Sequence, residues 1–295
     1  MIMTAPLSLQ RADPVITSRT NKRVADLVRL RLPRHRQRTG TFLIEGYREL
    51  ARALPEVDLQ TVYYCPSLWL HRHEAELLAR ARRRGAELVE LAAAPFHRIS
   101  YRDRPDGLLA VGRIFGTALD RLPITGPSDP SDPLLLVVER IEKPGNLGAM
   151  LRTACAAGVT GMIICDPATD PFGPGVVRAS LGHLFAVPLA ITDTDTALAW
   201  LDRHRIRIVA GTPAGSVASW DADLTGPTAL VIGSEQHGLS DRWVSHAQIR
   251  TRIPMVGGPD SLNAATAAGV LLFEAARQRA DPPAIRSDGP SNPVR

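Results

Sequence analysis

The 295-residue sequence has few cysteines, and the three present, Cys65, Cys155 and Cys165, are far apart and odd in number. This spacing argues against a disulfide framework and against a zinc site, so we expect no bound metal. The longest apolar runs, such as 134–138 and 264–273, are too short to span a bilayer, and no membrane association is expected. The first residues lack the basic start and apolar core of a signal peptide, so a cytoplasmic protein is expected.

Lysine and aromatic residues are also scarce. Lys22 and Lys143 are the only lysines among 35 basic residues, and aromatic residues make up 5% of the chain. The net charge of +5 comes from the first half, because residues 1–133 hold 21 basic and 15 acidic side chains, against 12 and 13 in residues 134–280. A GC-rich genome would by itself explain the preference for arginine. Arginine also suits bidentate phosphate contacts, whereas so few aromatic residues disfavour base stacking as the main mode of RNA recognition.

Composition divides the chain into five segments. Residues 1–15 and the polar, proline-rich residues 281–295 are typical of disordered ends. Four prolines between 122 and 133 indicate a linker, which we place at 116–133. Residues 16–115 alternate helix-like and strand-like stretches after a basic opening, with Ser18 or Thr20 as the expected cap of the first helix. They predict a small α/β domain, followed by a second domain at 134–280.

Continuous apolar strands alternate with helices in the second domain, which predicts a mostly parallel sheet covered on both faces. Ligands bind beyond the carboxyl ends of such strands. Three of the following loops are "IEKPGNLGAMLRTA", "SEQHGLS" and "MVGGPDSLNAA", each with glycine and a few polar side chains. Because none is a G-x-G-x-x-G or a phosphate-binding G-K-[ST] loop, a nucleoside-like ligand is favoured over a dinucleotide or a triphosphate.

Two polar residues in these loops have more than one possible structural role. Ser261 precedes an apolar helix predicted at 261–278 and could cap it or line a ligand site. Asn146 could likewise cap the helix predicted at 147–157 or belong to a site. Both roles can hold together, so the pattern alone leaves the alternatives open.

Three stretches carry a family resemblance. "PGNLGAMLRTACAAG", "IGSEQHGLS" and "IPMVGGPDSLNAATAAGVLLFEAARQR" resemble, in order and residue type, the motifs of the SpoU (TrmH-like) branch of the SPOUT RNA methyltransferases. The opening "ITSRTNKRV" and "RTGTFLIEGYRELARAL" resemble the substrate-binding domain often attached to that branch. The resemblance implies a C-terminal SPOUT α/β domain with a deep trefoil knot, preceded by a small ribosomal-protein-like α/β domain that binds RNA. It also implies a homodimer and S-adenosylmethionine as the cofactor.

The resemblance further implies a catalytic set within the three motifs: Asn146, Arg152, Glu235, Ser261 and Asn263. A ribose hydroxyl is a poor nucleophile, and its proton must leave as the methyl group arrives. Free arginine is a very weak base because its pKa lies above ~12. Arg152 must therefore be strongly perturbed or must orient and stabilise the developing alkoxide, and the assignment of the base stays open.

Other positions are implied as ligand contacts. The expected cofactor contacts are Gly211, Thr212, Gly233, Gly238, Ile253, Met255 and Leu262. The expected RNA contacts lie in the basic opening of the first domain: Arg19, Arg34, Arg36 and Arg38. His183 stands where the family usually has a small residue, and His237 occupies a variable place in its motif.

The function predicted from this resemblance is methyl transfer from S-adenosylmethionine to a ribose 2′-hydroxyl of structured RNA, with 23S ribosomal RNA as the first choice. Three alternatives stay open: a tRNA 2′-O-methyltransferase, an antibiotic-resistance rRNA methyltransferase, and an RNA-binding protein without catalysis. Methylation of a base rather than a ribose is a further variant, which nuclease digestion and nucleoside identification would separate.

Overall fold

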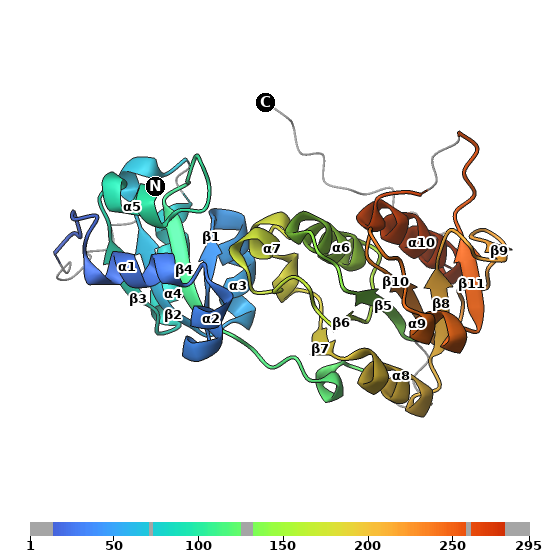
Figure 1. The fold of residues 1–295 in the computed structure, drawn as a ribbon. Helices are drawn as coiled ribbons and strands as arrows, with labels where there is room; N and C mark the ends of the chain where they lie inside the picture. The colour runs from blue at the N-terminus through green and yellow to red at the C-terminus, as the bar shows by residue number, and fades with distance from the viewer. Residues whose placement is uncertain (1–13, 71–72, 125–131, 258–260, 281–295) are drawn as a thin grey trace, which may run out of the picture.

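The computed structural model describes residues 14–70, 73–124, 132–257 and 261–280, which form two α/β domains lying side by side (Figure 1). Most of the expected disordered ends, 1–15 and 281–295, lies outside the described residues, as do positions 125–131 of the expected linker. Among the helices that are described, none is long and apolar enough to cross a membrane.

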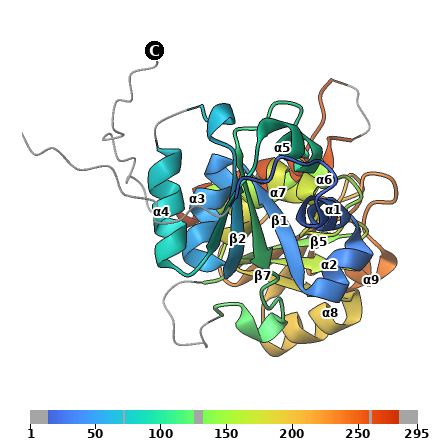
Figure 2. The ribbon, with the colours of Figure 1, turned by 90° about the vertical axis from the view of Figure 1, so that its left-hand side faces the viewer.

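The first domain contains a four-stranded sheet with helices on both faces (Figure 2). The strands, in sheet order, are β1 (Thr41–Glu45), β4 (Leu108–Arg113), β2 (Leu59–Tyr64) and β3 (Glu87–Glu90). Apolar side chains of α1 (Lys22–Arg29) and α5 (Ala93–Ile99) pack on one face, and those of α3 (Tyr47–Glu56) and α4 (Glu74–Arg83) pack on the other. The helix α1 begins after Asn21, whose side chain accepts from Arg23 N, so the expected caps Ser18 and Thr20 were wrong.

The second domain contains a seven-stranded sheet in which every strand pairing is parallel, which confirms the predicted parallel sheet. Its strands, in sheet order, are β7 (Leu189–Thr192), β6 (Gly161–Cys165), β5 (Leu134–Glu139), β10 (Thr228–Ile232), β8 (Arg207–Gly211), β11 (Ile249–Arg252) and β9 (Val217–Ala218). The helices α6 (Pro144–Ala156), α7 (Pro174–Ala179) and α10 (Ala264–Arg279) share a core with one face, whereas α8 (Thr194–Arg203) and α9 (Asp241–His246) pack on the other (Figure 1). The trefoil knot stays a prediction.

The strand order decides where the motifs meet. The strands β5, β10, β8 and β11 are consecutive neighbours and run parallel, so their carboxyl ends share one edge of the sheet. The three motif loops follow β5, β10 and β11, and the segment starting at Thr212 follows β8. Segments from four distant parts of the chain therefore meet at this edge, which is where open α/β sheets bind ligands.

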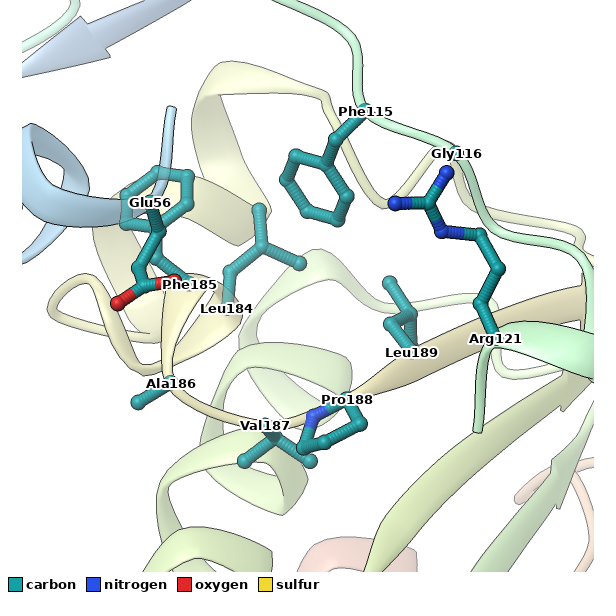
Figure 3. A pocket seen from close by; sticks show the side chains of 10 residues that line it. All are labelled: Glu56, Phe115, Gly116, Arg121, Leu184, Phe185, Ala186, Val187, Pro188 and Leu189. Atoms are coloured by element: carbon teal, nitrogen blue, oxygen red, sulfur yellow. The ribbon is translucent and has the colours of Figure 1, made fainter. Parts of the chain in front are cut away.

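The two domains share one continuous apolar core. Four of the six phenylalanines gather at the junction: Phe42 and Phe115 come from the first domain and its exit, and both lie 5.1 Å, centroid to centroid, from Phe172 of the second, while Phe185 lies 6.1 Å from Phe42. A pocket of about 320 Å³ remains beside this cluster. Figure 3 shows Phe115, Leu184 and Leu189 around it, and none of the predicted catalytic residues lines it.

Candidate active site

The helix α6 carries the first motif. It begins at Pro144 after Lys143, so Asn146 lies within its first turn and the expected cap at Asn146 was wrong. Leu147, Met150 and Leu151 are buried in the core and fix the helix on the sheet. Arg152 lies on the other side of the helix, is exposed, and has no hydrogen-bond or ion-pair partner among the described residues.

The loop after β10 carries the second motif and is folded tightly on itself. The backbone N–H of Gly238 donates to Ser234 O at 2.9 Å, and Gly238 has a φ of +65°. A Cβ on Gly233 would lie 2.1 Å from the backbone of Gly238, so this approach requires glycine. The turn buries both carboxylate oxygens of Glu235, and neither has a hydrogen-bond partner within the described chain.

The loop of the third motif leads directly into α10. The side-chain oxygen of Asn263 accepts from the backbone N–H groups of Ala265 and Thr266, at 3.0 and 3.3 Å, and Asn263 is therefore the N-cap. Ser261 is exposed and lies two residues before the cap, so its expected capping role was wrong. The side-chain nitrogen of Asn263 donates to the side-chain oxygen of Asn146 at 3.2 Å, which joins the first and third motifs.

The residues expected to contact the cofactor surround the same edge. Gly211 ends β8, and a Cβ there would lie 2.8 Å from Leu271 of α10 and 2.9 Å from Ile232. The backbone N–H of Thr212 donates to Thr251 O at 2.9 Å. Three half-buried side chains follow β11 or precede α10: Ile253, Met255 and Leu262. The structure thus places these residues at the edge without assigning them contacts to a ligand.

Buried polar atoms indicate the kind of ligand that fits. Almost all such atoms in proteins have hydrogen-bond partners, yet the carboxylate of Glu235 and the side-chain nitrogen of Asn146 have none in the described chain. The first accepts hydrogen bonds and the second donates them, so a ligand with both donors and acceptors fits, as the amino acid and nucleoside parts of S-adenosylmethionine have. No group of three or more His, Cys, Asp or Glu side chains within the described residues could hold a metal ion.

His183 adds a titratable group near Arg152. It begins a short 3-10 helix (His183–Phe185), and its Nδ1 atom is buried without a partner in the described chain. Burial, together with the charges of Arg52 and Arg152, lowers the pKa of His183. The ring is therefore neutral near pH 7, and it places a polar group where the resembling family usually has a small residue.

The basic opening of the first domain divides into two kinds of side chain. Arg19, Arg34 and Arg38 are exposed, and the guanidinium of Arg38 lies 2.9 Å from Nδ1 of His35. Arg36 is different, because it is 2% exposed and pairs across the domain junction with Asp170, with Nε donating at 2.9 Å. The expectation that Arg36 contacts RNA is therefore withdrawn, because its guanidinium is buried and paired inside the protein.

The fold and the site define a ligand-binding parallel α/β domain with a basic domain attached. The SpoU rRNA Methylase family model matches residues 133–273, and the MRM3-like substrate binding domain matches residues 21–110. The chain is 33% identical to a 23S rRNA (uridine(2479)-2'-O)-methyltransferase of Streptomyces viridochromogenes, over 83% of this chain and 85% of that protein. The chain belongs to the SpoU rRNA methylase family.

Solved structures resemble both domains together. An AdoMet-bound rRNA methyltransferase from Sinorhizobium meliloti is 32% identical, with a TM-score of 0.81 over 91% of this chain and 99% of that one. The SpoU methyltransferase AviRb from Streptomyces viridochromogenes, in complex with the cofactor AdoMet, is 32% identical, with a TM-score of 0.78 over 88% and 99%. The similarity extends over the junction, so the pairing of the two domains is part of the shared fold.

Proposed function

We propose that this protein transfers the methyl group of S-adenosylmethionine to a ribose 2′-hydroxyl of 23S ribosomal RNA. Its family membership and its similarity to a 23S rRNA 2'-O-methyltransferase support this function. The observation that carries the proposal is the hydrogen bond between Asn263 and Asn146, because it brings two of the motifs to one point at the carboxyl edge of the sheet.

The cofactor supplies a methyl group on a sulfonium centre, which an oxygen nucleophile can attack. The chain must then hold the ribose, favour loss of its proton and exclude competing water. Arg152 is exposed and unpaired within the described chain, so its guanidinium can approach the 2′-oxygen and stabilise the developing alkoxide. Asn146 and Asn263, already linked, are proposed to orient the ribose, and Ser261 lies exposed beside them.

The remaining contacts divide between cofactor and RNA. Glu235 is proposed to accept hydrogen bonds from the bound ligand, because its carboxylate lacks partners within the described chain. The backbone of the tight turn at Gly233 and Gly238, together with the cofactor contacts named from the sequence, is proposed to surround the cofactor. Arg19, Arg34 and Arg38 are proposed to bind RNA phosphates without reading the base sequence.

We also propose a homodimer through the second domain. Phe273 is 54% exposed and Val270 is 41% exposed on α10, the helix that carries the Asn263 cap. Exposed apolar side chains grouped on one helix are typical of a surface covered by a partner. A second copy of α10 packed on this surface would place the dimer interface next to the active site.

A substrate in ribosomal RNA further favours a cytoplasmic location for this protein.

The test of this function is a map of 2′-O-methylation in the ribosomal RNA of the host, with and without an intact copy of the gene. The proposal expects loss of methylation at one 23S position and its return when the gene is restored. An unchanged 23S map with a lost tRNA 2′-O-methyl group would instead support the tRNA alternative.

A further inference from the structure

A pocket of about 620 Å³ lies between the domains and contains the proposed catalytic arginine. Its lining comes from the 101–104 loop of the first domain and from α6, α7 and Leu181, which follows α7, in the second. The lining residues are Arg102, Asp103, Arg104, Arg152, Arg178, Ala179 and Leu181. Four of these seven residues are arginines, and one is acidic.

The second-domain side of this pocket is set by close packing of two helices. A Cβ on Gly148 of α6 would lie 2.4 Å from Cβ of Ala179, so only glycine permits this contact with α7. Arg152 follows Gly148 by one helical turn and therefore lies on the same side of α6. Arg178 precedes Ala179 directly. The contact brings the two guanidinium groups to one pocket.

The first-domain side is a loop held in place by buried carboxylates. Glu45, at the end of β1, accepts from the hydroxyl of Ser100 and from the backbone N–H of Tyr101, the latter at 2.7 Å. Asp106 accepts from the backbone N–H of Tyr47 at 2.8 Å. Glu45 and Asp106 are each 7% exposed. The 101–104 loop is therefore fixed to the core of its own domain on both sides.

This loop also lies over α7 of the second domain. A Cβ on Gly175 would lie 3.5 Å from the hydroxyl of Tyr101 and 3.1 Å from Pro144 of α6. Gly175 precedes Arg178 by three residues, so the loop follows the same side of α7 that carries Arg178. The first domain thus lies next to α7, and the same glycine of α7 lies next to the start of α6, the helix that bears Asn146 and Arg152.

The charges in the pocket are unequally compensated. Arg102 pairs with Glu49, which is 1% exposed, and with Asp106, so it serves as a structural anchor. Arg104, Arg152 and Arg178 are all exposed, and within the described chain none has a hydrogen-bond or ion-pair partner. Among the described residues of the lining, Asp103 is the only acidic one. Three unpaired guanidinium groups around one acid leave a positive pocket suited to phosphate.

We propose that this pocket binds an RNA backbone phosphate next to the methylated ribose, with Arg104 and Arg178 as its ligands. The first domain then supplies part of the active site itself, in addition to a remote surface that holds the RNA. This inference rests on the proposed function, because Arg152 marks where the reacting ribose lies. In this proposal Arg104 and Arg178 position the substrate, and Arg152 acts at the reacting ribose during methyl transfer.

The experiment compares Arg104→Ala and Arg178→Ala with the parent protein on an unmodified 23S rRNA transcript. Arg203→Ala is the matched control, because Arg203 is an exposed arginine without a described partner at the end of α8, on the opposite face of the sheet. We measure RNA affinity as a function of salt, KM and kcat for methyl transfer, and S-adenosylmethionine binding by calorimetry.

The proposal expects each pocket variant to lower the salt slope of RNA binding by about one and to raise KM at least about five-fold. It expects kcat and cofactor affinity to stay within about two-fold of the parent values, since the lost contact is to the bound substrate. Parent salt slope and KM in both pocket variants would overturn the inference. A lowered slope in the variants of a protein that methylates no RNA would overturn the proposed function alone.

Discussion

The side-chain nitrogen of Asn263 donates a hydrogen bond to the side-chain oxygen of Asn146 at 3.2 Å, although 117 residues separate them. The oxygen of Asn263 is occupied at the same time, because it caps α10 through Ala265 and Thr266. Asn263 therefore links the start of α10 to the start of α6. The nitrogen of Asn146 remains buried without a partner in the described chain and is the free donor of this pair.

Asn263→Asp separates the capping role from the site role. Aspartate caps a helix as well as asparagine does, so the free energy of unfolding should change by less than about 0.5 kcal/mol, whereas Asn263→Ala should lose about 1 kcal/mol. Aspartate cannot donate to Asn146, so kcat/KM should fall about ten-fold or more. Denaturant unfolding measures the change in stability, and a methyl-transfer assay measures kcat/KM. Full activity in Asn263→Asp would show that capping α10 is the only role of Asn263.

Glu235→Gln tests whether the buried carboxylate serves a ligand. An unpartnered buried carboxylate is costly, so the ligand-free variant should be at least as stable as the parent. If S-adenosylmethionine donates a hydrogen bond to this carboxylate, the variant loses the charge-assisted part of that bond. Its dissociation constant for S-adenosylmethionine should therefore rise about ten-fold. Calorimetry and thermal unfolding check the two effects. Unchanged cofactor affinity would place Glu235 outside the cofactor site.

Arg36→Ala tests the assignment of this arginine to the domain junction. Removing it leaves Asp170 without its ion-pair partner, with the backbone N–H of Phe172 still donating to it, and the free energy of unfolding should fall by about 3 kcal/mol. The salt slope of RNA binding should remain at the parent value, whereas the exposed Arg34→Ala should lower it by about one. A stable Arg36→Ala variant with a reduced salt slope would restore Arg36 to the RNA contacts.

Phe273→Asp tests the proposed dimer surface. A charge within the proposed apolar interface should convert a dimer to a monomer, as light scattering after size exclusion would show. Leu70→Asp is the control, because Leu70 is 69% exposed in the first domain and should leave assembly unchanged. A parent protein that is monomeric at micromolar concentration would contradict the proposal directly.

The sequence carried enough information for the sheet and for the motif edge, because both depend on local patterns. Continuous apolar strands require burial on both faces, and parallel strands bring their carboxyl ends together. The caps were harder, since a shift of two or three residues in a helix start changes the capping residue. Pro144 favours the first helical position, which moves the cap of α6 to Lys143 and away from Asn146.

Interactions between the domains could not be read from the sequence. The pairing of Arg36 with Asp170 joins residues 134 positions apart, and no local pattern distinguishes Arg36 from the exposed Arg34 and Arg38. The arginine pocket likewise forms only when the 101–104 loop lies over α7. The short helix α2 (Pro33–Thr39) also has too few apolar residues to show a helical period.

The most direct test of the central claim is transfer of label from S-adenosylmethionine to an unmodified 23S rRNA transcript, followed by identification of the labelled nucleoside. We expect one 2′-O-methylated nucleoside with the parent protein and with Arg203→Ala. We expect at least a hundred-fold lower rate, about 2.7 kcal/mol, with Arg152→Ala. Label on a base, no label at all, or full activity in Arg152→Ala would contradict the account.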